Sequence, residues 1–166
     1  MNKYLSYALQ LTFFVALYLV LEIWQTRNLL PDDGSQLAPK FSLVGIDGEV
    51  YQSSHLNQVP TVIYFFAPWC KVCHYSIPNL QKLYENTPKE QLNILAVVLD
   101  WQSKEEVIEY IKEHELSMPV LLGTTETMQD FKIQAFPTYY VLDKDQKITK
   151  VSMGYSTEIG LRMNTP

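Results

Sequence analysis

The segment Thr61-Val-Ile-Tyr-Phe-Phe-Ala67-Pro-Trp-Cys70-Lys-Val-Cys73 is the most informative part of the chain about its fold. Residues 61–67 are nearly all β-branched or aromatic, a composition typical of a strand that is buried on both faces. The residues that follow favour a helix from about Cys70 to Asn86, bent where Pro78 removes a backbone hydrogen bond. The first cysteine is therefore expected where a buried strand passes into a helix.

The chain around this stretch alternates between strand and helix patterns, which predicts an α/β fold with a central sheet and helices on its faces. Asp47-Gly48 is a hairpin turn signal between two short strands, and Ser103-Lys-Glu-Glu106 is a capping box that begins a helix. The other expected elements are strands at 92–99 and 119–122, a helix at 125–132, a hairpin of 138–142 with 147–153, and a final helix capped by Ser156.

The cysteine content indicates chemistry rather than structural cross-linking. The chain has 166 residues and only two cysteines, both in the motif Cys70-Lys71-Val72-Cys73. A small domain held together by disulfides needs more cysteines, spread along the chain. A structural zinc site needs about four ligands, and only three histidines accompany this pair. The net charge of -5 offers no basic surface for phosphate, which argues against nucleic acid as a partner.

The position of the two cysteines suits disulfide exchange. At a helix N-terminus, free N–H groups and the helix dipole stabilise the thiolate of Cys70. Cys73 follows one turn later, close enough to bond to Cys70. An activated nucleophile with a resolving thiol beside it is the arrangement that thiol–disulfide exchange requires.

The stretch TVIYFFAPWCKVCHYSIPNL, followed by SMPVLLG, FKIQAFPTYYVLDKDQKI and GY, resembles the thioredoxin-fold family of TlpA, ResA and DsbE. The resemblance covers residues 39–155 and implies a thioredoxin fold: a central mixed sheet flanked by helices, with an N-terminal hairpin and a strand–helix insert. It implies an oxidoreductase that uses Cys70 and Cys73 and needs no cofactor. It also implies a cis bond at Phe136-Pro137, whose backbone pairs with a substrate segment, and Trp69 as a shield of the cysteines.

The resemblance further implies the partners: exported proteins with thiols or disulfides, and a membrane reductase of the DsbD type. The chain departs from the family pattern at Val72, where many members have proline. Tyr64, Ser76 and Thr138 stand where members carry acidic residues, which argues against a role in cytochrome maturation. The Cys-x-Val-Cys form is closer to the ScsD-like branch of the family, which is linked to copper tolerance.

The residues around the pair also predict its redox character. The helix dipole, the charge of Lys71 and a protonated His74 all favour the thiolate of Cys70, and Val72 completes the variable part of the motif. The carboxylate that opposes this effect in the family is replaced by Tyr64 and Ser76. We therefore expect a pair more oxidising than thioredoxin, whose potential is about -270 mV.

Two alternatives use the same motif. Cys70, Cys73 and His74 are soft ligands that would suit a copper-binding or substrate-holding module. Cys-Lys-Val-Cys-His is also formally the attachment motif of a c-type haem, with His74 as axial ligand. The sequence alone leaves both the copper-binding or substrate-holding module and the haem protein open. No metal or functional role is predicted for His55 or His114, and Trp101 is interpreted as a packing residue.

The N-terminal residues 1–24 are predicted to be a transmembrane anchor. Residues 4–21 carry no charge, about 20 helical residues cross the hydrocarbon core, and no signal-peptide cleavage site follows. Residues 25–38 are polar and contain proline and glycine, which predicts a linker to a thioredoxin-like domain at 39–166. We therefore expect a single-pass protein in the inner membrane, with its catalytic domain on the periplasmic side.

Overall fold

A mixed five-stranded sheet forms the centre of the computed structural model, which describes residues 3–26, 28–56 and 58–165. Its strands lie in the order β5-β4-β3-β6-β7. β3 runs parallel to β4 and antiparallel to β6, and the sheet is therefore mixed, as a thioredoxin fold requires. The strands are β5 (Val120–Leu122), β4 (Asn93–Val98), β3 (Thr61–Phe66), β6 (Thr138–Leu142) and β7 (Ile148–Met153).

The central strand β3 is buried on both faces, as its composition predicts. Val62, Tyr64 and Phe66 belong to one hydrophobic cluster, while Ile63 and Phe65 belong to a second cluster on the other face. This division follows from the period of two residues in a strand. Each fully buried side chain of this size stabilises the fold by about 1.5–3 kcal/mol, so β3 is the main fixed element from which the site is built.

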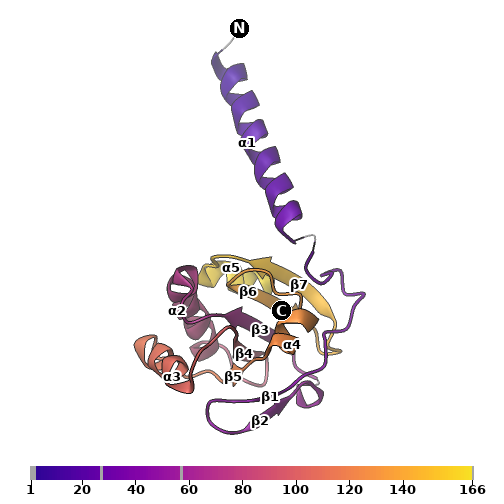
Figure 1. Ribbon diagram of the computed structural model, residues 1–166. Helices are drawn as coiled ribbons and strands as arrows, with labels where there is room; N and C mark the ends of the chain where they lie inside the picture. The colour runs from indigo at the N-terminus through magenta and orange to yellow at the C-terminus, as the bar shows by residue number, and fades with distance from the viewer. Residues whose placement is uncertain (1–2, 27, 57, 166) are drawn as a thin grey trace.

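Helices and a hairpin cover the two faces of the sheet (Figure 1). The cluster that contains Tyr64 includes residues of three helices, and the cluster that contains Phe65 includes the hairpin and residues beside the short helix α4. The three helices are α2 (Lys71–Glu85), α3 (Lys104–Glu113) and α5 (Glu158–Asn164). The opposite face carries α4 (Thr125–Asp130) and the hairpin of β1 (Ser42–Val44) with β2 (Val50–Gln52), which the 3-10 turn η1 (Ser53–His55) follows.

Two helix caps differ from the sequence predictions. Ser103 caps α3 as expected, but the Glu106 carboxylate accepts from the N–H of Gln102 rather than from that of Ser103, so the capping box is incomplete. The prediction that Ser156 caps the last helix is wrong, because Thr157 is the N-cap of α5. Ser156 is instead buried, and its backbone pairs with the side chain of Ser76.

The N-terminal helix α1 (Lys3–Thr26) projects away from the domain (Figure 1). Within the described residues, no helix combines the length and the apolar character that crossing a membrane requires, and the predicted anchor is unconfirmed. Residues 1–2 of that anchor and residue 27 of the predicted linker lie outside the described residues. Later in the linker segment, Leu29 and Leu30 are buried against the domain, and Leu37 forms a bridge to Lys147 beside β7.

Candidate active site

The turn between β3 and α2 holds the two cysteines. The Cys70 N–H donates to the Ala67 carbonyl at 3.1 Å, and Cys70 is the N-cap residue of α2. Its sulfur accepts from the N–H of Cys73 at 3.2 Å, and the same N–H also donates to the Cys70 carbonyl at 2.9 Å. Cys70 and Cys73 are joined in a disulfide.

The two sulfurs differ in access to solvent. Cys70 is 6% exposed, whereas Cys73 is fully buried in the hydrophobic cluster on the α2 side of the sheet. A partner thiolate must attack one of the two sulfurs of a disulfide, and Cys70 is the only one of this pair that reaches the surface. The geometry therefore distinguishes an outer sulfur from an inner one.

The Phe136–Pro137 segment faces the outer sulfur because of the strand order. β3 and β6 are antiparallel with Phe65 opposite Thr138, so the chain leaving β3 and the chain entering β6 meet at one edge of the sheet. The Phe136–Pro137 bond is cis, as predicted. The Phe136 carbonyl oxygen lies 3.5 Å from the Cys70 sulfur, and the Thr138 hydroxyl donates to the Ala135 carbonyl at 2.9 Å, which fixes this segment.

Trp69 covers the site from the other side of the motif. Its indole N–H donates to the carboxylate of Asp100 at 2.9 Å, and its ring meets Phe136 edge-on at 5.8 Å between centroids. Trp69 nevertheless remains 58% exposed, and the next side chains, Lys71 and Val72, are exposed as well. Sequence reasoning missed Asp100, since nothing in the residues after β4 indicates that they lie beside Trp69.

Neutral groups occupy positions where the family resemblance would place acids. Tyr64 and Ser76 are both fully buried. Burial raises the pKa of the Tyr64 hydroxyl, so this side chain keeps its proton at physiological pH. The Ser76 hydroxyl accepts from the Ser156 N–H at 3.2 Å, and it therefore serves the contact between α2 and the start of α5.

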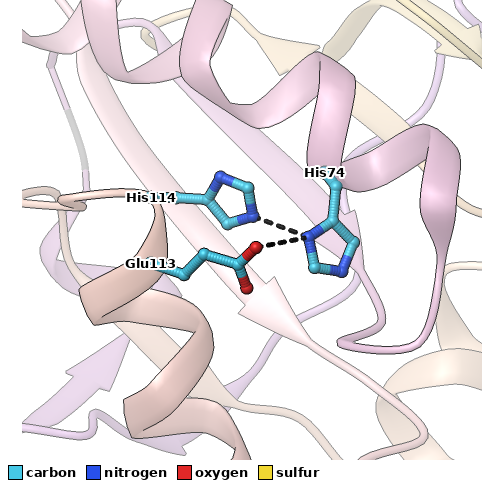
Figure 2. A group of neighbouring side chains, drawn as sticks. All are labelled: His74, Glu113 and His114. Atoms are coloured by element: carbon cyan, nitrogen blue, oxygen red, sulfur yellow. Dashed lines mark hydrogen bonds and ion pairs between the residues drawn. The ribbon is translucent and has the colours of Figure 1, made fainter.

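His74 makes contacts that its sequence context did not indicate. Its Nε2 lies 2.8 Å from the Pro68 carbonyl oxygen, and because a carbonyl can only accept, this ring nitrogen carries the proton. Its Nδ1 lies 2.8 Å from Nε2 of His114, and 3.8 Å from a carboxylate oxygen of Glu113 (Figure 2). Burial and then the charge of His74 lower the pKa of His114, against the opposite effect of Glu113. His74 and His114 lie 40 positions apart in sequence, so no local spacing could reveal the pair.

A disulfide at the start of the helix that follows the central strand, beside a cis-proline, defines a thiol–disulfide oxidoreductase of the thioredoxin fold. The chain belongs to the AhpC/TSA family, whose model matches residues 35–151. It is 28% identical over 120 residues to the sporulation thiol-disulfide oxidoreductase A of Bacillus subtilis, covering 70% of this chain and 72% of the relative. It is 32% identical over 125 residues to the thiol-disulfide oxidoreductase ResA of Oceanobacillus iheyensis, covering 72% of this chain and 65% of the relative.

The solved structures agree with the sequence comparisons. The crystal structure of StoA from Bacillus subtilis matches with a TM-score of 0.68 at 25% identity, covering 77% of this chain and 97% of that one. A thiol:disulfide interchange protein from Chlorobium tepidum matches the fold with a TM-score of 0.71. The chain is therefore an enzyme that exchanges thiols and disulfides through its Cys-x-x-Cys pair, and the prediction of a TlpA/ResA/DsbE-type protein is confirmed.

Proposed function

We propose that Cys70 forms the mixed disulfide with a partner protein and that Cys73 resolves it. In the oxidising direction, a partner thiolate attacks the Cys70 sulfur, the Cys70–Cys73 bond breaks, and Cys73 leaves as a thiolate. A second thiolate of the partner then attacks the partner's sulfur in the mixed disulfide and releases Cys70 as a thiolate. The partner ends with a disulfide and this protein with two thiols. In the reducing direction the steps run in reverse: the Cys70 thiolate attacks a partner disulfide, and Cys73 then attacks the Cys70 sulfur of the mixed disulfide and releases the partner with two thiols. The observation that carries the proposal is that Cys70 keeps 6% of its surface exposed whereas Cys73 is fully buried.

The local structure supports Cys70 as the stabilised thiolate. Its sulfur already accepts a backbone N–H at the start of α2, and the positive end of the helix dipole lies there. The exposed Lys71 adds a positive charge in the first turn, although solvent ions screen it. With the neutral Tyr64 and Ser76 behind the pair, these contacts favour the reduced form. A stabilised reduced form makes the disulfide a stronger oxidant, which supports the prediction of a potential above that of thioredoxin.

The surface around Cys70 suits a protein substrate. Three exposed apolar side chains, Trp69, Val72 and Tyr75, surround Cys70 in sequence. Exposed apolar groups of this size mark contact surfaces, and aromatic residues contribute most of the binding energy at such interfaces. We propose that a partner segment lies across Trp69 and along the Phe136–Pro137 backbone, where it can pair in the manner of an added strand.

The two alternative interpretations of the motif need a different environment. A c-type haem needs His74 as an axial ligand, yet its Nε2 donates to the Pro68 carbonyl and its Nδ1 faces His114. A copper-binding or substrate-holding module needs both thiolates free at once, and the disulfide between them supports redox cycling instead.

The proposed location is the outer side of a cytoplasmic membrane, with exported proteins as partners and a reductase of the DsbD type as the source of electrons. The support for the anchor comes from sequence alone, from the uncharged residues 4–21. We expect the full chain to fractionate with membranes and to resist extraction by alkaline carbonate, and a variant that lacks residues 1–24 to become soluble. Release of the full chain by carbonate would contradict the anchor and leave the chemistry untouched.

Trapping of mixed disulfides tests the roles of the two cysteines. Cys73→Ser removes the resolving thiol, so this variant should accumulate mixed disulfides that disappear on addition of dithiothreitol. Cys70→Ser should accumulate none, because the buried Cys73 cannot reach a partner. Mass spectrometry of the linked peptides identifies the cysteine involved. Equal trapping by both variants, or trapping through Cys73 alone, would overturn the assignment.

A further inference from the structure

Three potential metal ligands meet where the first turn of α2 packs beside the end of α3 (Figure 2). His74 lies in the first turn of α2, Glu113 is the last residue of α3, and His114 is its C-cap. One ligand atom from each residue lies within 4.8 Å of the other two. The group is separate from the disulfide, although His74 directly follows Cys73 in the chain.

We propose that His74, Glu113 and His114 bind a divalent transition-metal ion of the zinc class. Imidazole nitrogens suit zinc, copper and nickel, whereas calcium and magnesium prefer sites made only of oxygen. Two imidazoles and one carboxylate form the ligand set of open zinc sites, in which water takes the fourth position. The site is thus a three-ligand centre with one position left for water or an incoming ligand.

The orientation of His74 supports this assignment. A metal-binding histidine commonly donates its other ring N–H to a backbone carbonyl, which fixes the tautomer and aims the second nitrogen at the ion. His74 has this arrangement: its Nε2 donates to the Pro68 carbonyl at 2.8 Å. Its Nδ1 is then unprotonated and points at His114 and Glu113 (Figure 2).

The distances fit an ion after a small adjustment. Two nitrogens at about 2.0–2.1 Å from a tetrahedral zinc ion lie roughly 3.3 Å apart, and the two ring nitrogens lie 2.8 Å apart here. The rings must therefore separate by about half an ångström, and His114 must move its proton from Nε2 to Nδ1, so that two metal bonds replace the hydrogen bond between the rings. The side chains have room to move, since that of His74 is 30% exposed and that of Glu113 is 64% exposed.

Solvent reaches the site through a surface hollow. A cavity of about 460 Å³ is lined by the three ligands together with Lys71 and Tyr75. Its size admits a hydrated ion and a water molecule in the fourth position. Because Lys71, the residue that follows Cys70, also lines this hollow, the site lies beside the redox motif.

The test uses the full-length chain without a histidine tag, with Cys70 and Cys73 oxidised so that no thiolate is present. Isothermal titration with Zn²⁺ and visible spectroscopy with Co²⁺ should report one site per chain, and the Co²⁺ spectrum should show the intense bands of low-coordinate nitrogen and oxygen ligation. His114→Gln and Glu113→Gln should each weaken Zn²⁺ binding by about tenfold or more. Loss of a residue that only hydrogen-bonds to a metal ligand already costs about that much in affinity.

Two matched variants control for unspecific surface binding. His55 is the one histidine of the chain outside the cluster, and it is exposed; Glu109 is exposed one turn before Glu113 on α3. His55→Gln and Glu109→Gln should bind Zn²⁺ as the parent protein does. A parent dissociation constant weaker than about 1 mM would overturn the proposal. So would equal losses in the control variants and in His114→Gln.

Discussion

At the scale of single residues, the two buried tyrosines Tyr64 and Tyr139, behind the active site, differ in their hydrogen bonds. They are direct partners across β3 and β6, and both side chains are buried. The Tyr139 hydroxyl accepts from the Asn164 side chain at 2.7 Å. The Tyr64 hydroxyl is buried close to the Ser76 side chain, but within the described residues it makes no hydrogen bond. Two buried tyrosines therefore lie opposite each other in the sheet, and only the hydroxyl of Tyr139 makes a hydrogen bond.

This difference predicts that the same substitution has different effects at the two positions. Tyr139→Phe should lower the free energy of unfolding by about 0.5–1.5 kcal/mol, because it leaves the Asn164 amide without its acceptor. Tyr64→Phe should leave that free energy unchanged or raise it by up to about 1 kcal/mol, because it removes an unsatisfied buried hydroxyl. Denaturant unfolding of the oxidised proteins measures both values. A loss for Tyr64→Phe as large as that for Tyr139→Phe would show that the Tyr64 hydroxyl is bonded after all.

At the scale of elements, we expect the first turn of α2 to set the redox character of the pair. Lys71→Glu replaces a positive by a negative charge in that turn, which disfavours the Cys70 thiolate and hence the reduced protein. The reduction potential should fall by roughly 10–40 mV, the equivalent of helix-terminus charge effects in this couple. Equilibration with glutathione measures the shift.

The matched variant for this prediction lies at the other end of the same helix. Lys82 occupies the last turn of α2, so Lys82→Glu changes the net charge equally without placing a charge beside Cys70. Its potential should equal that of the parent within error, since such effects fade within one turn of the helix end. Equal shifts in the two variants would mean that net charge, rather than the local helix terminus, controls the couple.

The elements also show what the sequence could predict and why the rest stayed hidden. The strand at Thr61–Phe66 and the helix from Lys71 were predictable, because burial on two faces and the cysteine motif leave local patterns. The cis bond at Phe136–Pro137 followed from the family resemblance. The pairing of Asp100 with Trp69, and of His74 with His114, depends on how separate elements pack, which no spacing in the chain encodes.

At the scale of the whole molecule, the sheet brings distant segments to one edge. The antiparallel pairing of β3 with β6 places Cys70 beside Phe136, although 66 positions separate them in sequence. α2 and α3 pack on one face of this sheet and bring His74, Glu113 and His114 together close to the cysteine motif. One fold thus supports a redox pair and the proposed metal site through different elements.

The most direct test of thiol–disulfide exchange by Cys70 and Cys73 is the redox equilibrium of the full chain with glutathione buffers. The fraction of disulfide is followed by alkylation and mass spectrometry as the ratio of reduced to oxidised glutathione changes. We expect a reversible two-electron transition, reached equally from both directions, with a potential above about -270 mV. A pair that does not equilibrate with glutathione would contradict the exchange chemistry, and a reversible potential at or below that of thioredoxin would contradict the proposed oxidising character.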